Sequence, residues 1–424
     1  MRRILYVSLS QEMWRRRLVF LAGAVVVGVV SVGFAKGADG AQDIYSHLFA
    51  KWPWLPLIMT PLGFAIIAGI THRWFPAATG SGIPQVIAAR ASHNDAMRRS
   101  LLGFDTMVAK MVLTTLAIFF GASVGREGPT VQIGASIMFA IGGLVGMGHR
   151  NGLVLGGAAA GIAAAFNAPL AGIVFAIEEL AKAFDGRINE MVIASVVIAG
   201  GVSWLLVGNY PYFGELLMPE ARPYGWMAIP ISAIFGGVLG GLFSLAMITL
   251  KSTPPAYLSA LFSRPMTFAA LCGIVVALLS IATNGYASGN GYAEMRAGLE
   301  HGVELPWWYG LAKMLTTLLS SISGIPGGLF SPSLAVGGGI GSMAGTVFTW
   351  IDTRVLVLLM MAGYFAAVVQ SPLTASIIVM EMTSHRDMII PLMATSVLAT
   401  YISRRISPEP LYHALAKDFV RRTP

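Results

Sequence analysis

The sequence predicts an all-α integral membrane protein built from two similar halves. Three observations carry this prediction: a composition poor in charge, long runs without charged residues, and an internal repeat with a constant spacing. Of the 424 residues, 55% are hydrophobic and only 11% are charged, and the mean hydropathy is +0.71. Soluble domains contain roughly a quarter charged residues, so most of the surface of this chain must face lipid.

Six apolar runs contain no Asp, Glu, Lys or Arg, and each is near or above the ~20 residues that a membrane-spanning helix needs. Several are longer than one crossing and are interrupted by Gly and Pro. We therefore expect pairs of short helices that meet at membrane depth, where protein or a water-filled cavity satisfies the interrupted backbone. The runs are Leu18–Ala35, Asn151–Ile177, Met191–Gly214, Tyr224–Leu250, Met314–Ile351 and Val355–Met380.

Basic residues flank the first and last runs, and the formal net charge is +8. By the positive-inside rule, this placement predicts that both termini are cytoplasmic, and it explains the charge without a nucleic-acid partner. The first run can also be read as a cleaved signal, but its long basic flank and the many later runs favour a membrane helix. The flanking residues are Arg2, Arg3, Arg15, Arg16 and Arg17, and Arg404, Arg405, Lys417, Arg421 and Arg422.

A spacing of 203 residues brings unusual positions of two halves into register over about 70 residues. We interpret this match as an internal duplication, which in membrane transporters places the substrate site where interrupted helices of the two halves meet. If both termini are cytoplasmic and each half crosses an odd number of times, the halves are inverted relative to each other. The matched pairs include Lys110 and Lys313, Gly125 and Gly328, Pro129 and Pro332, Pro169 and Pro372, and Glu178 and Glu381.

Three Gly-rich segments, each ending in Pro, predict helix starts inside the membrane: Gly80–Pro84, Gly125–Pro129 and Gly327–Pro332. A helix start has unpaired N–H groups and a partial positive charge, so it attracts an anion without a buried cation. One such segment alone is more often a kink or a close helix contact, but three together favour an anion site. The candidate ligands are the backbone N–H groups of Gly82, Ile83, Gly128 and Gly328 and the hydroxyl of Ser81.

Glu127 lies within the second Gly-rich segment, where its carboxylate can face the anion path. A carboxylate there competes with an anion for the same donors and leaves when it takes up a proton. The alternative is a local ion pair with Arg126, which we disfavour because adjacent helical residues point in different directions. Ionisable groups at membrane depth are functional by default, so we predict that Glu127 is both a gate and a proton carrier.

Four further positions carry expectations. Glu178 and Glu179 end an apolar run, where an acidic pair opposes the helix dipole. We expect one of them to reach the aqueous interface and the other to be an inward-facing proton relay, and the residues alone leave open which. Tyr412 follows the last run, so composition alone predicts an interfacial anchor. Cys272 is the only cysteine; it excludes an intrachain disulfide or a thiolate metal site and is expected to be a small buried hydrophobe.

These motifs resemble those of the CLC family of chloride channels and transporters over nearly the whole chain. Besides the three Gly-rich segments, the resemblance rests on Ala165–Gly172, Ile177–Glu179 and Pro410–Tyr412. It implies a CLC-type fold of two inverted-topology helical repeats with broken helices meeting at mid-membrane, and a homodimer with one pore per subunit. The roles that it implies are external gating by Glu127, internal proton transfer by Glu179, and anion binding by the hydroxyls of Ser81 and Tyr412 and the N–H groups of Leu329 and Phe330.

Within this family, an internal glutamate accompanies proton-coupled exchange, so Glu179 favours a chloride–proton antiporter, and Ser81 favours chloride over nitrate. Ser331 and Ser333 depart from the Ala and Met that are frequent there, with an open effect on selectivity. The alternatives are a passive voltage- or pH-gated anion channel of the same fold and a fluoride- or nitrate-preferring relative. An enzyme is disfavoured because the seven His are scattered and no nucleophile–base set or metal-ligand spacing occurs. No metal or other cofactor is expected.

We expect a single transmembrane domain over residues 1–424. It would comprise a basic cytoplasmic segment at 1–17, a first repeat near 55–210, a second near 225–403, and a cytoplasmic tail at 404–424. The short tail after Tyr412 leaves no room for the cytosolic nucleotide-binding domains of many relatives. Such a chain resembles prokaryotic members, so we expect an inner (cell) membrane, with chloride and protons as substrates and membrane lipid around the protein.

Overall fold

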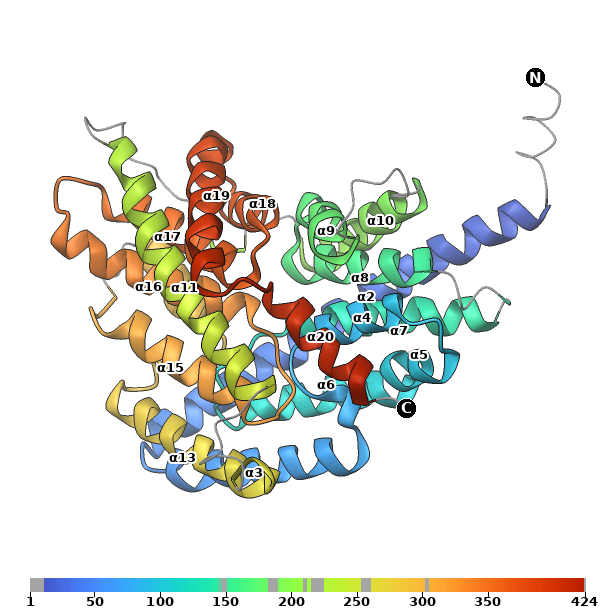
Figure 1. Cartoon of the computed structure of the whole chain (residues 1–424), viewed down its shortest axis with the longest axis horizontal. Coiled ribbons are helices and arrows are strands. Elements are labelled where there is room, and N and C mark those ends of the chain that lie inside the picture. Colours follow the sequence, from blue (N-terminus) through green and yellow to red (C-terminus); the bar gives the residue numbers. More distant parts are fainter. Residues whose placement is uncertain are drawn as a thin grey trace.

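The computed structural model describes residues 11–144, 146, 151–181, 190–208, 212–214, 225–252, 261–301 and 305–422, which contain helices and no strand (Figure 1). Residues 1–10 of the predicted basic N-terminal segment, and the side chains of Arg15 and Arg16, lie outside this description. The helices of the first half are α2 (Gln11–Lys51), α3 (Pro56–Trp74), α4 (Ile83–Ala91), α5 (Asp95–Leu102), α6 (Phe104–Phe119), α7 (Glu127–Leu144), α8 (Asn151–Phe166), α9 (Pro169–Phe175) and α10 (Glu190–Val207). Those of the second half are α11 (Ala228–Ser252), α13 (Pro265–Ala282), α14 (Tyr292–His301), α15 (Tyr309–Ile322), α16 (Phe330–Val347), α17 (Thr353–Val369), α18 (Pro372–Thr383), α19 (Ile389–Ile406) and α20 (Leu411–Arg422).

The surface of the helix assembly is suited to lipid. Five helical stretches in the described part of the chain are long and apolar enough to cross a membrane. Large apolar side chains lie on the outside, with Leu144 and Leu205 both 87% exposed. Exposing so many apolar side chains is unfavourable in water but favourable in the hydrocarbon of a membrane. The five stretches are Arg17–Lys51, Asp95–Phe119, Glu190–Val207, Gly225–Ser252 and Pro265–Ala282.

Two of the long apolar runs fold as pairs of short helices, as expected from their Gly and Pro content. The backbone breaks at Asn167 (φ 55°) between α8 and α9, and at Gln370 (φ 60°) between α17 and α18. Both residues adopt the left-handed conformation, which is uncommon outside glycine, and the next helix begins two residues later with Pro at its first turn. The breaks are 203 residues apart, so the repeat seen in the sequence extends to the backbone.

Close backbone approaches at glycine fix how the paired helices pack. A Cβ atom at Gly134 of α7 would collide with the carbonyl oxygen of Gly157 of α8. At the equivalent place in the second half, a Cβ atom at Gly337 of α16 would collide with the carbonyl oxygen of Met360 of α17. Small residues allow this packing in membrane proteins, where the hydrophobic effect does not drive helices together. A glycine at the contact therefore allows α7 to pack closely against α8, and α16 against α17.

The longest helices of each half also take matching places. α2 packs against α8 and α10, just as α11 packs against α17 and α19. The helices of the two halves lie around a central region in which α4, α7, α16 and α20 come together (Figure 1). The starts of α4, α7 and α16 lie within the three Gly-rich segments, and this arrangement positions the candidate site.

Candidate anion and proton site

The three Gly-rich segments meet and are joined by backbone hydrogen bonds. Gly125 and Gly328 each donate an N–H to the carbonyl oxygen of the other, at 2.8 and 2.7 Å. Gly80 donates to Ile325 at 3.2 Å and accepts from Gly327 at 3.0 Å. The helix starts of the two halves are thus held together by main-chain pairing. The prediction that the Gly328 N–H is an anion donor is wrong, because that group is already committed to Gly125.

A buried lysine braces one of these segments. Lys110 of α6 is fully buried, and its ammonium donates to the carbonyl oxygens of Gly80 at 2.8 Å and Thr79 at 3.3 Å. Its repeat counterpart Lys313 of α15 donates to Ser288 at 2.6 Å and Gly289 at 2.7 Å. Carbonyl oxygens satisfy the hydrogen-bonding capacity of an ammonium group but leave its charge in place. A protonated Lys110 contributes positive potential next to the segment that carries Ser81.

Two buried hydroxyls lie together at the start of α4. The oxygen of Tyr412, on α20, lies beside that of Ser81, and among the described residues neither has a hydrogen-bond partner of good geometry. Gly82, just before α4, has φ 101°, a conformation that glycine adopts readily. Buried polar groups in proteins have partners, so the pair is chemically suited to a small polar ligand. The composition-based prediction of an interfacial anchor is wrong, because Tyr412 is completely buried.

An aromatic cluster surrounds the start of α16 next to the hydroxyls of Ser81 and Tyr412. The ring of Phe330 stacks on Phe166 with centroids 5.8 Å apart and contacts Phe365 edge-on at 4.7 Å. It also lies 6.1 Å from the ring of Tyr412. These rings exclude water from the first turn of α16, and electrostatic interactions are stronger where water is excluded.

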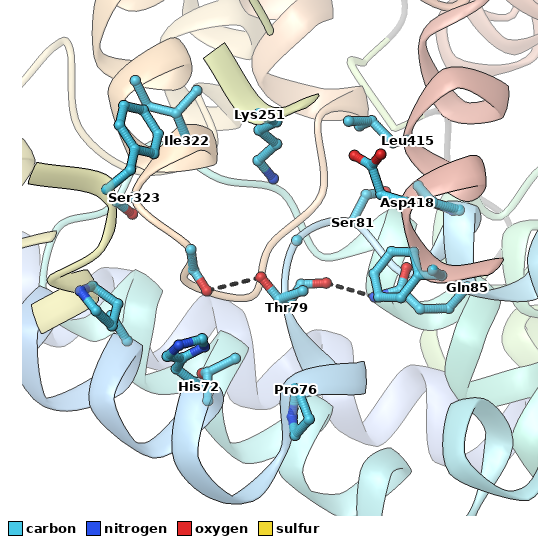
Figure 2. A pocket seen from close by; sticks show the side chains of 18 residues that line it. His72, Pro76, Thr79, Ser81, Gln85, Lys251, Ile322, Ser323, Leu415 and Asp418 are labelled. Carbon is cyan, nitrogen blue, oxygen red and sulfur yellow. Dashed lines mark hydrogen bonds between the residues drawn. The ribbon is translucent and has the colours of Figure 1, made fainter. Parts of the chain in front are cut away.

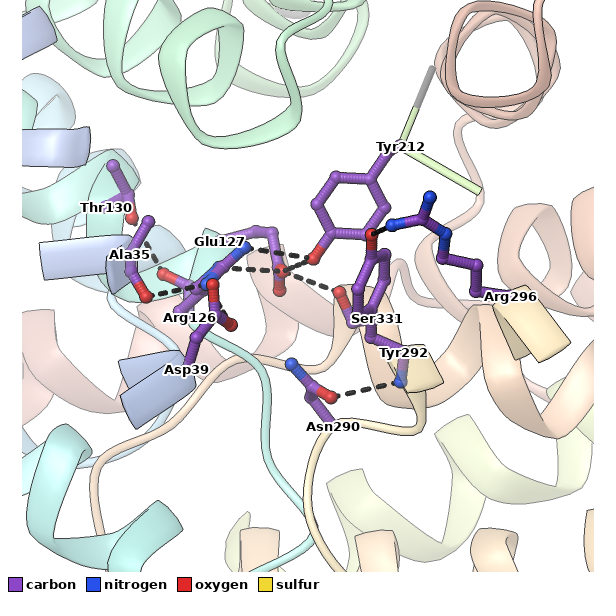
Figure 3. Close-up of polar contacts among 10 residues, drawn as sticks. All are labelled: Ala35, Asp39, Arg126, Glu127, Thr130, Tyr212, Asn290, Tyr292, Arg296 and Ser331. Atoms are coloured by element: carbon purple, nitrogen blue, oxygen red, sulfur yellow. Dashed lines mark hydrogen bonds and ion pairs between the residues drawn. The ribbon is translucent and has the colours of Figure 1, made fainter. Parts of the chain in front are cut away.

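Glu127, the first residue of α7, is completely buried and faces donors from other parts of the chain (Figure 3). Its Oε1 atom accepts hydrogen bonds from the hydroxyls of Ser331 at 2.5 Å and Tyr212 at 3.4 Å. The same atom lies 4.0 Å from Nε of Arg126. Our expectation that Arg126 points away is wrong, because α7 begins at Glu127 and the helical geometry behind the argument does not apply to Arg126.

Arg126 is itself held mainly by α2. Its guanidinium forms an ion pair with Asp39 and donates to the carbonyl oxygen of Ala35 at 2.6 Å. It also lies over the ring of Tyr212, 5.9 Å from the centroid. Arg126 is thus paired mainly with Asp39. The closest hydrogen-bond donor to the carboxylate of Glu127 is the hydroxyl of Ser331.

The two consecutive glutamates lie in a π-helical turn, Ala176–Ala181. Glu179 is buried, and its Oε2 atom accepts a hydrogen bond from the hydroxyl of Ser371 at 2.5 Å. Glu178 is half-buried and accepts from the N–H groups of Leu373 at 3.1 Å and Thr374 at 2.6 Å. That one of the pair reaches the aqueous interface stays a prediction for Glu178, whose half-buried carboxylate also has protein donors. The hydroxyl of Tyr412 lies within electrostatic range of both Glu179 and Glu127.

A cavity of about 200 Å³ opens beside Ser81 (Figure 2). It is lined by segments of both halves, including Thr79, Lys251 of α11 and Asp418 of α20. The hydroxyl of Thr79 donates to the carbonyl oxygen of Gly324 at 3.0 Å, so this wall also joins the halves. Ser81, one member of the hydroxyl pair, therefore lines this cavity.

Comparison with known proteins identifies the family. Residues 63–404 match the family described as voltage gated chloride channel. The chain belongs to the CLC family. It is 30% identical to the H(+)/Cl(−) exchange transporter ClcA of Yersinia pestis, over 94% of this chain and 87% of that protein. It is 29% identical to the transporter of the same name from Citrobacter koseri, over 94% and 88%.

Solved CLC structures share the fold. A slow cyanobacterial Cl−/H+ antiporter superposes with a TM-score of 0.81 at 24% identity, covering 96% of this chain and 98% of that one. A CLC-type fluoride/proton antiporter superposes with a TM-score of 0.79 at 22% identity, covering 95% and 98%. The predicted fold class is confirmed: this CLC chain is an all-α integral membrane protein of two helical repeats with broken helices. The reciprocal contacts between its halves agree with inverted repeats.

Several residues of this CLC site were not predicted. Asp39, Tyr212 and Ser371 contact the glutamates or Arg126 from segments that no motif marks. Ser331 was noticed only as a departure from the family pattern, and Lys110 only as a marker of the repeat. A signal was present for Lys110, because an isolated lysine within an apolar stretch requires partners when it is buried. In the part of the chain that the structure describes, no three His, Cys, Asp or Glu side chains are grouped so as to hold a metal ion.

Proposed function

We propose that this chain is a secondary active transporter that exchanges chloride for protons. The observation that carries the proposal is the burial of two carboxylates, Glu127 and Glu179, in the same part of the protein as the buried hydroxyls of Ser81 and Tyr412. One anion position between two proton-binding groups is what coupled exchange requires. The similarity to transporters named for H(+)/Cl(−) exchange supports the same substrates.

In the proposed cycle, the anion reaches the hydroxyls of Ser81 and Tyr412 through the cavity beside them. The N–H groups of Gly82, Ile83, Leu329 and Phe330, and that of Gly128 further along the path, complete its ligands. These donors lie at or near helix starts, where the partial positive charge favours an anion over a cation. The buried ammonium of Lys110 adds to this potential.

Glu127 is the proposed gate. Its deprotonated carboxylate competes with the anion for the helix-start donors and occupies the outer position. A proton removes that negative charge, so the side chain leaves and an anion enters. Glu179 supplies or receives the proton on the other side of Tyr412. Each cycle therefore links the movement of an anion to the opposite movement of a proton.

Reconstitution in liposomes tests this function. With the membrane potential clamped, an imposed chloride gradient is expected to drive protons uphill in the wild-type protein. Proton movement should disappear in Glu127→Gln and in Glu179→Ala. Chloride flux without proton movement in the wild-type protein would contradict the exchanger and indicate a passive channel. Competition with fluoride and nitrate in the same vesicles establishes which anion is preferred.

The assembly and the membrane are also proposals. We propose a homodimer with one pore in each subunit, surrounded by lipid in the inner membrane of a prokaryote, with both termini cytoplasmic and no enzymatic activity or cofactor. We retain a single transmembrane domain with repeats near 55–210 and 225–403. The bacterial relatives and the exposed apolar side chains of α10 and α19 support a membrane-embedded subunit that packs against lipid or a second copy. Cross-linking in native membranes and protease access to each terminus test these points.

A further inference from the structure

The carboxylate of Glu127 receives two hydroxyl donors that do not belong to its own helix (Figure 3). Ser331 comes from the first turn of α16 in the other half of the chain, and Tyr212 from segment 212–214. Both side chains are buried, Ser331 at 1% and Tyr212 at 2% exposure. Both donate to the same oxygen, Oε1, so they act on one charge.

Tyr212 is held so that its hydroxyl keeps this direction. Its ring packs edge-on against Phe166 at 6.1 Å, Phe213 at 5.2 Å and Tyr292 at 4.5 Å. The hydroxyl of Tyr292 in turn accepts a hydrogen bond from Arg296 at 3.2 Å. Hydrogen bonds to Glu300 and Tyr292 raise the pKa of Arg296, so this outer support stays charged at all physiological pH values.

We propose that Ser331 and Tyr212 are positioning residues that hold the deprotonated carboxylate of Glu127 in the closed position and thereby set the pH at which the gate opens. The inference rests on the proposed function, because it assigns a pH threshold to the proposed gate. Ser331, at 2.5 Å, is the principal donor, and Tyr212, at 3.4 Å, is the weaker one.

The physical reason is the preference of hydroxyl donors for the charged acceptor. A hydrogen bond to a carboxylate is about twice as strong as one to a neutral group, and donors to the charged form favour that form. The other titratable or charged groups facing Glu127 are Arg126 beside it, Asp39 of α2 behind Arg126, and Tyr412 of α20. Removing the Ser331 hydroxyl leaves these groups in place, so the remaining change is a weaker hold on the deprotonated carboxylate in the closed position.

The test is chloride efflux from liposomes at a series of external pH values. We expect Ser331→Ala to raise the pH of half-maximal efflux by about one to two units, the effect of losing one hydrogen bond to a charged group. Tyr212→Phe should raise it by less, and Ser331→Thr, which keeps the hydroxyl, should restore the wild-type profile. Ser333→Ala is the matched control. Ser333 is buried in the same turn of α16, and its hydroxyl has no hydrogen-bond partner among the described residues.

The outcomes separate this inference from the proposed function. Superimposable pH profiles for wild type, Ser331→Ala and Tyr212→Phe overturn the inference, even if Glu127→Gln abolishes proton coupling and so upholds the exchanger. Conversely, a wild-type protein that moves chloride without protons overturns the exchanger. A raised efflux pH in Ser331→Ala would still support control of the gate by Ser331. An equal shift in Ser333→Ala would contradict the inference, because it would reflect a general disturbance of α16.

Discussion

Glu178 and Glu381 make the same interaction in opposite directions. Glu178, in the first half, accepts from the N–H groups of Leu373 and Thr374 at the start of α18, at 3.1 and 2.6 Å. Glu381, in the second half, accepts from Leu170 and Ala171 at the start of α9, at 3.1 and 2.6 Å. A carboxylate at a helix start satisfies N–H groups and interacts favourably with the positive end of the helix dipole. Each half therefore provides a carboxylate that caps the start of a helix in the other half.

We predict that Glu178→Gln and Glu381→Gln each lower the free energy of unfolding of the purified protein by ~1–2 kcal/mol, because a helix start then loses a charged acceptor. The two effects should be similar, since the two contacts are alike. Glu409→Gln, which alters an exposed pair with Lys417, should change stability by less than about 1 kcal/mol. Thermal unfolding in detergent measures all three, and a large difference between the first two would contradict mutual capping.

Removing the hydroxyl of Tyr412 should weaken chloride binding. We predict a roughly five- to tenfold loss of affinity in Tyr412→Phe, corresponding to the net contribution of one hydrogen bond. Tyr364→Phe is the matched control, because Tyr364 is equally buried on α17 and its hydroxyl also has no partner among the described residues. Calorimetric titration with chloride distinguishes the two variants. Equal affinities would remove Tyr412 from the proposed ligands.

Lys110→Met should reduce both stability and chloride affinity. The variant removes the ammonium donor to the carbonyl oxygens of Gly80 and Thr79, which keep donors from Gly327 and Gln85, so we expect a cost of about 1 kcal/mol for each lost hydrogen bond. It also removes a buried positive charge beside Ser81. Lys313→Met removes the donor to the carbonyls of Ser288 and Gly289 instead, so it should destabilise at least as much but affect chloride binding less. Unfolding and titration of both variants test the difference, and equal affinity losses would argue against an electrostatic role for Lys110.

The contact between α7 and α8 should not tolerate a side chain at Gly134. Gly134→Ala forces a methyl group against the carbonyl oxygen of Gly157, so we predict destabilisation by ~1–3 kcal/mol. In the same helix, a Cβ atom at Gly143 meets nothing within 4 Å. Gly143→Ala should therefore be neutral or stabilise by up to about 1 kcal/mol. A thermal shift assay of the two variants decides, and similar melting temperatures would contradict the close packing.

Local signals in the sequence predicted the broken helices well. The breaks at Asn167 and Gln370 follow from apolar runs too long for one helix and from the Pro two residues later. The helix start at Glu127 follows from the Gly and Pro around it. Such features depend on neighbouring residues, so they can be recognised without knowing the fold.

Contacts between distant segments account for what could not be predicted. Ser331 and Tyr212 reach Glu127 from 204 and 85 residues away, and nothing near either residue indicates that partner. The Gly328 N–H looked available because its pairing with Gly125 exists only once both segments are in place. Tyr412 looked interfacial because composition does not reveal that α20 turns inward against α4 and Phe330.

The main-chain bonds that join Gly80 and Gly125 to the segment Ile325–Gly328 limit how this protein can work. Rocking the two halves apart, so that first one side and then the other opens, would break these main-chain hydrogen bonds. The hydrogen-bonded backbone instead acts as a stationary frame, and the proposed exchange cycle then depends on movements of side chains. Turnover should then depend little on bilayer thickness or stiffness, which hinder large swinging motions far more than the rotation of one carboxylate.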